Sequence, residues 1–210
     1  EGNPDAVRGR AESTLDCANS GTTMRLLSGL LSGRGVAAEL IGDKSLSRRP
    51  MGRITVPLGE MGYAITAAGE GGRPPLTLTG GEHRPGDYTY RSPVASAQVK
   101  SCVLLAGLEA TGDIVVTEPA PSRDHTERLL RYLGYRVESS GNYADPDGQS
   151  AYVRLFQSPP GFVPRARPIR VPGDISSAAF FLVAAALVGG ARIVLEEVSI
   201  NPTRVGILDL

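Results

Sequence analysis

The chain has 210 residues, enough for one large domain or two smaller domains with a substantial core. Hydrophobic residues make up 41% and charged residues 21%, and the formal net charge is zero. A neutral chain without tryptophan has no general attraction for nucleic acid or for acidic membranes, and we expect neither as a partner.

Membrane insertion and secretion are not indicated either. The most apolar run, Ala178 to Leu187, is shorter than the roughly 20 residues that a spanning helix needs, so we expect a core helix there. The chain starts at Glu1 without the charged and apolar pattern of a secretory signal. Cys17 and Cys102 have no metal-binding or redox spacing, and we expect buried, reduced thiols in a cytoplasmic protein.

One design recurs along the chain. Apolar runs of helical length occupy residues 19–31, 96–108 and 176–187, and each opens with small or hydroxyl residues. The spacing from Ser20 to Ser96 is 76 residues, and from Ser96 to Ser176 it is 80. A period this long predicts a supersecondary unit that is used several times, because one unit alone cannot bury its apolar face.

Each repeat contains more than its first helix. Arginines precede a second predicted helix in two copies, and both of these helices end in Gly-Tyr, at Gly62 and at Gly134. Strand-like runs occupy residues 36–41, 64–67, 76–79, 113–117, 136–138, 152–155, 169–171 and 191–195. The order is helix, strand, helix and a strand pair, which predicts a mixed α/β fold.

The remaining segments are irregular. Residues 80–87 are rich in glycine and polar residues and predict a surface turn, residues 139–150 predict a hairpin loop, and the proline-rich residues 157–168 predict an extended connector. We therefore expect two repeat units of a first domain in residues 1–168. Residues 169–210 are then the crossover and the start of a second domain. The third copy stops partway at Leu210, so we expect the chain to be an internal part of a longer protein.

The usual motifs of metal and nucleotide chemistry are missing from the sequence. His83 and His125 have no metal-ligand partners at a usual spacing, and we expect no metal and no cofactor. His125 is interpreted as a polar residue at a helix start. What remains is a polar set at the predicted helix starts: Asn19, Ser20, Gly21, Thr22, Arg49, Ser96, Ala97, Gln98, Ser122, Arg123, Asp174, Ser176 and Ser177. Helix N-termini and guanidinium groups attract anions, so this set predicts a site for a polyanion.

Simple helix capping is the competing interpretation. Thr22, Ser176 and Ser177 suit capping as well as they suit ligand binding. Capping does not account for Gln98 or for the arginines, although Arg49 is also compatible with an exposed position. Lys100 lies within an apolar helix, is compatible with an exposed helix face, and is left out of the set.

Five motifs, in the same order, resemble bacterial 5-enolpyruvylshikimate-3-phosphate (EPSP) synthases. They are Leu15–Leu26, Gly42–Met51, Ser96–Ser101, Ser122–Glu127 and Val171–Ser177. The resemblance implies a two-domain, inside-out α/β barrel, in which each domain is built from three βαβαββ units. It also implies transfer of the enolpyruvyl group of phosphoenolpyruvate to the 5-hydroxyl of shikimate 3-phosphate, a step toward chorismate and the aromatic amino acids. Glyphosate inhibits this family.

The resemblance also assigns the site residues. It implies phosphoenolpyruvate contacts at Asn19, Gly21, Arg49 and Gln98. It implies shikimate 3-phosphate contacts at Ser96, Ala97, Gln98, Ser122, Arg123 and Asp174. The family's catalytic acid and base have no counterpart in these residues, so we expect this chain to bind substrates without turning them over alone. We expect the parent enzyme to be monomeric.

The sequence departs from the family pattern at one position, and alternative interpretations stay open. Ala18 stands where the family more often has glycine. The related UDP-N-acetylglucosamine enolpyruvyl transferase is the nearest other enzyme, although Ser96–Gln98 and Ser122–His125 fit the shikimate enzyme better. A non-catalytic anion-binding module or a purely structural domain is the alternative from a different class.

Overall fold

The computed structural model describes residues 13–140, 151–202 and 204–209. The chain divides into two compact units, residues 1–164 and residues 165–210. Whether this division separates functional domains stays a prediction. The expected hairpin loop of residues 139–150 lies almost wholly outside the described residues.

The first unit contains the βαβαββ motif twice in succession. Its first copy consists of β1 (Ser13–Asp16), α1 (Gly21–Gly33), β2 (Ala38–Ile41), the short 3₁₀ helix η2 (Leu46–Arg48), α2 (Gly52–Glu60), β3 (Ile65–Gly69) and β4 (Arg73–Leu78). Its second copy consists of β5 (Tyr88–Arg91), α3 (Ala97–Ala106), η3 (Gly107–Glu109), β6 (Ile114–Glu118), α4 (His125–Tyr132), β7 (Val137–Ser140) and β8 (Ala151–Leu155). The predicted α/β class and the repeat are confirmed.

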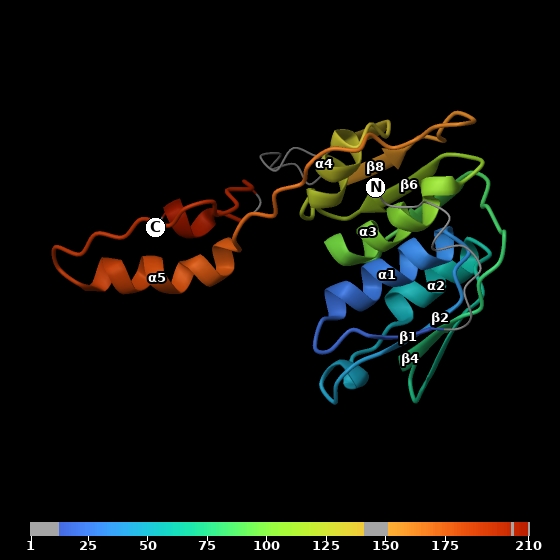
Figure 1. The fold of residues 1–210 in the computed structure, drawn as a ribbon, viewed down its shortest axis with the longest axis horizontal. Helices are drawn as coiled ribbons and strands as arrows, with labels where there is room; N and C mark the ends of the chain where they lie inside the picture. The colour runs from blue at the N-terminus through green and yellow to red at the C-terminus, as the bar shows by residue number, and fades with distance from the viewer. Residues whose placement is uncertain (1–12, 141–150, 203, 210) are drawn as a thin grey trace. The chain divides into compact units, whose positions relative to one another are not determined.

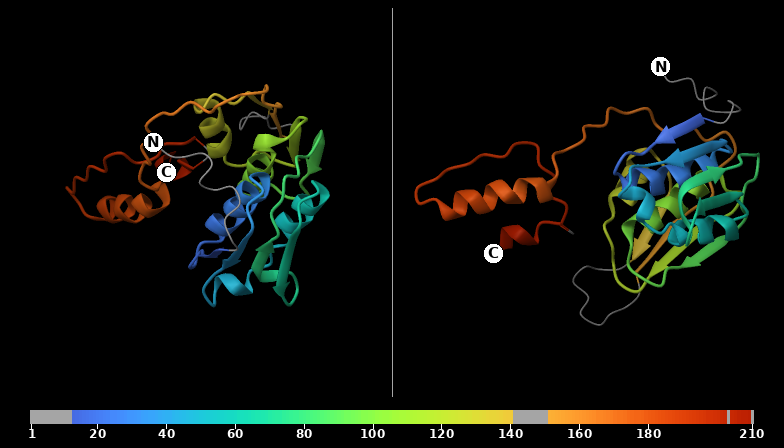
Figure 2. Two further views of the ribbon diagram at one scale, coloured as in Figure 1. Left: turned by 45° about the vertical axis from the view of Figure 1, so that its right-hand side comes forward. Right: turned by 90° about the horizontal axis from the view of Figure 1, so that it is seen from below.

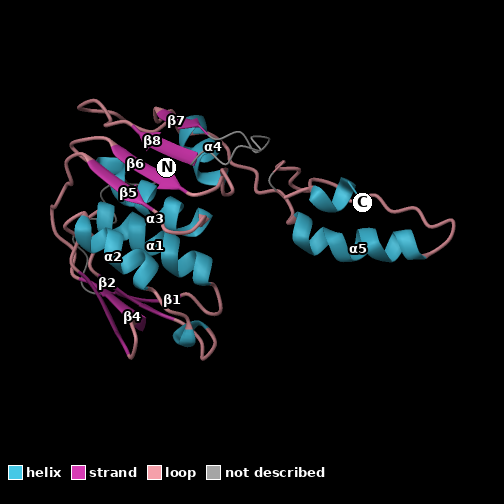
Figure 3. Ribbon diagram, turned by 180° about the vertical axis from the view of Figure 1, so that it is seen from behind, coloured by secondary structure: helices cyan, strands magenta, loops and turns pink. Residues whose placement is uncertain are grey.

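The two copies form two sheets with the same topology. The strand orders are β1-β2-β4-β3 and β5-β6-β8-β7. In each sheet the first pair is parallel, because a helix crosses over between its strands, and the other pairs are antiparallel. Figure 3 shows α1, α2 and α3 between the sheets, which follows the implied arrangement of helices inside and sheets outside.

The helices between the sheets carry much of the core. Met24 on α1, Leu58 on α2 and Leu104 on α3 are fully buried, together with Leu40 and Ile114 from the two sheets. Figure 1 shows α1 and α3 side by side near the middle of this unit. The core therefore fixes the two helices whose first residues belong to the predicted site.

Small residues allow α1 and α3 to approach closely. A Cβ atom placed on Gly29 would lie 2.8 Å from the carbonyl carbon and 2.9 Å from the Cα of Cys102. One placed on Gly33 would lie 2.9 Å from the carbonyl carbon of Ala106. Glycine is thus required at both positions for the two backbones to touch. The thiols of Cys17 and Cys102 are free and buried, as predicted.

The second unit contains α5 (Ile175–Leu187) and the short η4 (Gly206–Asp209). The predicted strands at residues 169–171 and 191–195 do not form. Among the described residues of this unit, an isolated parallel bridge joins Gly173 to Val198. Val171 is 84% exposed and Val194 is 68% exposed, and a strand pair without a third strand or a covering layer is at best marginally stable.

The other predicted segments agree with the structure. Residues 157–168 form an irregular connector, which is visible in the two views of Figure 2 as a loop that leaves β8. Both second helices end before Gly62 and Gly134, which have φ angles of +91° and +97°. Among the described residues, no helix has the length and apolar character that a bilayer crossing requires.

Candidate active site

The first part of the site is the start of α1. Ser20 is the N-cap, and its Oγ accepts a hydrogen bond from the Thr23 N–H at 3.1 Å. Gly21, the first helical residue, is buried. A Cβ atom at Gly21 would lie 2.9 Å from Nη1 of Arg25 and 3.1 Å from Nη1 of Arg49. Two guanidinium groups therefore approach the same glycine at a helix N-terminus.

Arg49 is held by a short chain of polar contacts. Its Nη2 donates to Oδ1 of Asn19 at 3.0 Å, and Nδ2 of Asn19 donates to Oδ2 of Asp43 at 2.7 Å. The backbone N–H of Leu46, and after it the Asn19 amide, lower the pKa of Asp43. Asp43 is thus an ionised anchor that orients Asn19 and, through it, Arg49.

Arg25 connects this group to α3. Its Nη1 donates to Oε1 of Gln98 at 2.7 Å, and Nε2 of Gln98 donates to Oγ1 of Thr22 at 2.6 Å. Partial burial, and after it the charges of Arg49 and Arg53, lower the pKa of Arg25. Like charges gathered in one place favour an anionic ligand, because it would relieve their repulsion.

The second part of the site lies on the other side of Gln98. A cavity of about 120 Å³ opens between the starts of α1, α3 and α4. It is lined by Thr22, Leu26, Ala97, Gln98, Ser101, Arg123, His125 and Thr126. Three predicted ligand-binding residues, Ala97, Gln98 and Arg123, thus share one cavity. Gln98 belongs to both parts of the site.

Ser96 and Ser122 lie beside this cavity and are joined by one carboxylate. Oε1 of Glu118 accepts from the Ser96 N–H at 2.7 Å, and Oε2 accepts from the Ser122 hydroxyl at 2.7 Å. Ser96 is the N-cap residue of α3, yet its side chain makes no capping hydrogen bond. Helix capping by the side chain therefore does not explain why a hydroxyl residue stands at position 96.

Three sequence interpretations need correction. Thr22 does not cap α1, because Ser20 does. Ser176 and Ser177 do not cap α5; the N-cap is Asp174, whose side chain accepts from the Ser176 N–H at 3.1 Å. Lys100 is not on an exposed face, since it is only 3% exposed and forms ion pairs with Glu118 and Glu127.

Asp174 belongs to the second unit. The backbone N–H of Ser176 is the main cause that lowers its pKa, so the side chain is an ionised N-cap. An Arg204 nitrogen lies 3.8 Å from Oδ1 of Asp174. A role for Asp174 toward shikimate 3-phosphate stays a prediction.

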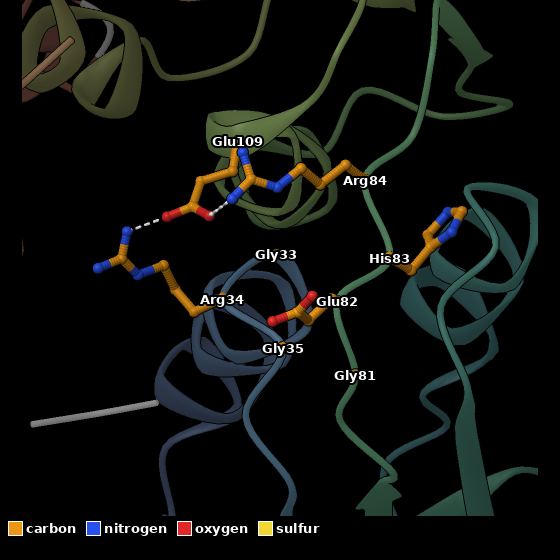
Figure 4. A pocket seen from close by; sticks show the side chains of 8 residues that line it. All are labelled: Gly33, Arg34, Gly35, Gly81, Glu82, His83, Arg84 and Glu109. Carbon is orange, nitrogen blue, oxygen red and sulfur yellow. Dashed lines mark hydrogen bonds and ion pairs between the residues drawn. The ribbon is translucent and has the colours of Figure 1, made fainter. Parts of the chain in front are cut away.

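A larger hollow, of about 480 Å³, lies at the other end of α1 (Figure 4). It is lined by Gly33, Arg34, Gly35, Gly81, Glu82, His83, Arg84 and Glu109. Arg34 and Arg84 both pair with Glu109, so their charges are partly neutralised and attract an anion less strongly. None of the predicted site residues lines this hollow, and we favour the smaller cavity as the site.

Arg25 is a candidate site residue that the sequence interpretation did not include. It stands four residues after Gly21, so the two occupy one face of the helix. That spacing was a usable signal, but an arginine inside an apolar helix is also typical of an exposed face. Within residues 13–140, 151–202 and 204–209, no three His, Cys, Asp or Glu side chains are grouped as metal ligands.

Comparison with known proteins decides the family. The family model described as EPSP synthase (3-phosphoshikimate 1-carboxyvinyltransferase) matches residues 1–210. The chain belongs to the EPSP synthase family. The resemblance inferred from the five motifs is thereby confirmed.

Individual members of the EPSP synthase family agree with this assignment. The 3-phosphoshikimate 1-carboxyvinyltransferase of Hydrogenovibrio crunogenus is 53% identical over 197 residues, covering 93% of this chain and 42% of the relative. That of Bacillus velezensis is 49% identical over 199 residues, covering 95% and 43%. The solved EPSP synthase of Acinetobacter baumannii matches with a TM-score of 0.79 and 50% identity, over 95% of this chain and 42% of that one. The chain thus spans about two fifths of the length of these family members.

Proposed function

We propose that this chain supplies substrate-binding residues for transfer of the enolpyruvyl group from phosphoenolpyruvate to the 5-hydroxyl of shikimate 3-phosphate, with release of inorganic phosphate. Membership in the EPSP synthase family supports the reaction. The observation that carries the proposal is the position of Gln98. It bonds to Arg25 beside Gly21 and also lines the cavity that contains Arg123, so it lies between two cationic sites.

We assign phosphoenolpyruvate to the cluster at the start of α1. Its phosphate and carboxylate are anionic, and a guanidinium presents two parallel N–H donors that fit either group. Nη1 of Arg25 and Nη1 of Arg49 lie 2.9 Å and 3.1 Å from the position that a Cβ atom of Gly21 would take, so the absent Cβ lets both guanidinium groups come close to the helix N-terminus. Asn19 holds Arg49 in this orientation.

We assign shikimate 3-phosphate to the cavity beside α3 and α4. Arg123 supplies the charge for the 3-phosphate, Gln98 supplies a polar side chain, and the Ser96 hydroxyl, which makes no capping hydrogen bond, is a candidate donor. Ala97 adds little bulk, which lets a ring approach the backbone. With Gln98 between the ligands, the 5-hydroxyl and the vinyl group are held close together, which lowers the entropic part of the barrier.

Residues 1–210 bind and orient the substrates in this proposal. Protonation of the vinyl carbon and removal of the hydroxyl proton need an acid and a base. The assigned side chains are guanidinium, amide and hydroxyl groups, which do not suit those roles at neutral pH. We therefore propose that the 210-residue chain alone does not turn over, and that the parent protein works in the cytoplasm, where free thiols stay reduced.

Phosphate release tests the proposal. The natural full-length protein is mixed with phosphoenolpyruvate and one acceptor, and inorganic phosphate is measured over time. We expect release with shikimate 3-phosphate and none with unphosphorylated shikimate or UDP-N-acetylglucosamine. Release with UDP-N-acetylglucosamine instead would assign the chain to the related transferase. Release with no acceptor preference would contradict the assigned phosphate site.

A further inference from the structure

A cluster of buried charges lies behind the start of α3. Lys100 on α3, Glu118 at the end of β6 and Glu127 on α4 are 3%, 2% and 1% exposed. Nζ of Lys100 lies 3.1 Å from Oε2 of Glu118, 2.8 Å from Oε1 of Glu127 and 3.3 Å from the carbonyl oxygen of Ser122. All three donors of the ammonium group therefore have acceptors.

Stability alone does not account for this cluster. Burying three charged groups carries a desolvation penalty, and packed apolar side chains of similar volume are often equally stable or more stable. Oε2 of Glu127 is buried and has no hydrogen-bond partner among the described residues. Buried polar atoms without partners are rare, so this arrangement calls for a further explanation.

The contacts of the cluster lead directly to the proposed site. Glu118 fixes the Ser96 backbone through one oxygen and the Ser122 hydroxyl through the other. Lys100 holds the Ser122 carbonyl, which belongs to the peptide that joins Ser122 to Arg123. The segment that carries Arg123 is therefore held at both the side chain and the backbone of Ser122.

We propose that Glu118 is a positioning residue for shikimate 3-phosphate, and that Lys100, anchored by Glu127, holds Glu118 in place. This inference rests on the proposed function. Glu118 touches no substrate; it sets the distance between the first residue of α3 and the segment before α4. The phosphate-binding groups on these two segments then face the same cavity without rearrangement when the substrate arrives.

The test is a steady-state comparison in the natural full-length protein. Glu118→Gln keeps the shape of the side chain but replaces one acceptor oxygen by a donor, so it cannot serve both serines and Lys100. We expect the KM for shikimate 3-phosphate to rise about tenfold, the order expected when a hydrogen bond to a charged group is lost. We expect the KM for phosphoenolpyruvate to stay within about twofold.

Glu109→Gln is the matched control. Glu109 also pairs with two cations, Arg34 and Arg84, but it lies just beyond the other end of α3. Its substitution should leave both KM values unchanged, which separates the loss of an ion pair from the loss of the positioning contact. Glu118→Asp is the second variant, used even if Glu118→Gln does not fold. It keeps the charge near Lys100 and withdraws the carboxylate from the serines, and it too should raise the KM for shikimate 3-phosphate alone.

The outcomes separate the two proposals. A wild-type protein with acceptor-dependent phosphate release, together with Glu118 variants whose KM for shikimate 3-phosphate is unchanged, would overturn the positioning role and leave the proposed function standing. Equal rises in both KM values would also overturn it, since they would indicate a general structural role. A wild-type protein without any dependence on shikimate 3-phosphate would overturn the proposed function and this inference together.

Discussion

The contact between α1 and α3 makes a sharp prediction about Gly29. Replacing Gly29 by Ala would place a Cβ atom 2.8 Å from the carbonyl carbon of Cys102. Ordinary contacts between two carbon atoms begin at about 3.5 Å. The atoms that it meets belong to the helix backbone and not to a flexible side chain. The two helices must therefore separate.

The cost follows from two opposing terms. Overpacking a rigid contact costs about 3 kcal/mol, and an alanine in a helix returns about 1 kcal/mol relative to glycine. The net loss is about 2 kcal/mol, which lowers the melting temperature of a protein of this size by about 4–8 °C. Separation also stretches the bond between Arg25 and Gln98, which crosses the same interface. The same substitution should therefore weaken phosphoenolpyruvate binding as well as lower the stability of the protein.

Differential scanning calorimetry measures the effect, with Gly59→Ala as the control. Gly59 lies in α2, and a Cβ atom there would meet nothing within 4 Å. That substitution should keep or raise the melting temperature by a few degrees, because only the helix propensity changes. A Gly29→Ala protein that melts at or above the wild-type temperature would refute the close approach of the two helix backbones.

Three further predictions concern the site and the core. Gly21→Ala should leave the melting temperature nearly unchanged, because its Cβ displaces only flexible guanidinium groups. It should weaken the binding of phosphoenolpyruvate more than the binding of shikimate 3-phosphate. Equal effects on both ligands in titration calorimetry would count against the assignment. Arg25→Lys should weaken phosphoenolpyruvate about tenfold, since lysine keeps the charge but loses the fork, and an unchanged KM would exclude Arg25 from the site. Burial raises the pKa of Cys102 to about 12, so its thiol should resist a disulfide reagent at pH 8 until the protein is unfolded, and rapid labelling of native protein would contradict this burial.

The same thiol has a consequence for stability against pH. Its pKa is higher in the folded protein than in the unfolded chain, where it is about 8.5–9. The stability that it contributes is therefore complete below pH 9. It is lost as the pH rises from 9 toward 12, because the unfolded state releases the proton first.

The repeat was predictable because long helices with apolar periodicity leave a clear pattern. Residues 19–31 and 96–108 predicted α1 and α3 within a few residues. The strands β1 and β5 left no comparable signal, since Ser-Thr-Leu-Asp and Tyr-Thr-Tyr-Arg contain few aliphatic residues. They form because each pairs in parallel with a neighbouring strand of the same repeat. Sequence periodicity does not reveal such long-range pairing.

The residues of the candidate site are easier to predict at the helix starts than among the buried charges. Gly21 and Gln98 stand in short motifs at helix N-termini, where glycine and amide side chains are informative. Lys100 was misjudged because its partners, Glu118 and Glu127, lie on other elements and show no local spacing. Arg25 was missed for a similar reason, since its importance depends on Arg49 and Gln98 from distant segments.

In the proposed function, the starts of α3 and α4 hold a doubly charged phosphate. Isothermal titration of shikimate 3-phosphate into residues 1–210, with Arg123→Ala beside the wild-type chain, measures whether this phosphate site exists. We expect saturable one-to-one heat for the wild type and at least tenfold weaker binding for the variant, because a charge-assisted contact is lost. Absence of binding by the wild-type chain, or equal binding by both proteins, would show that Arg123 does not hold the phosphate at this site.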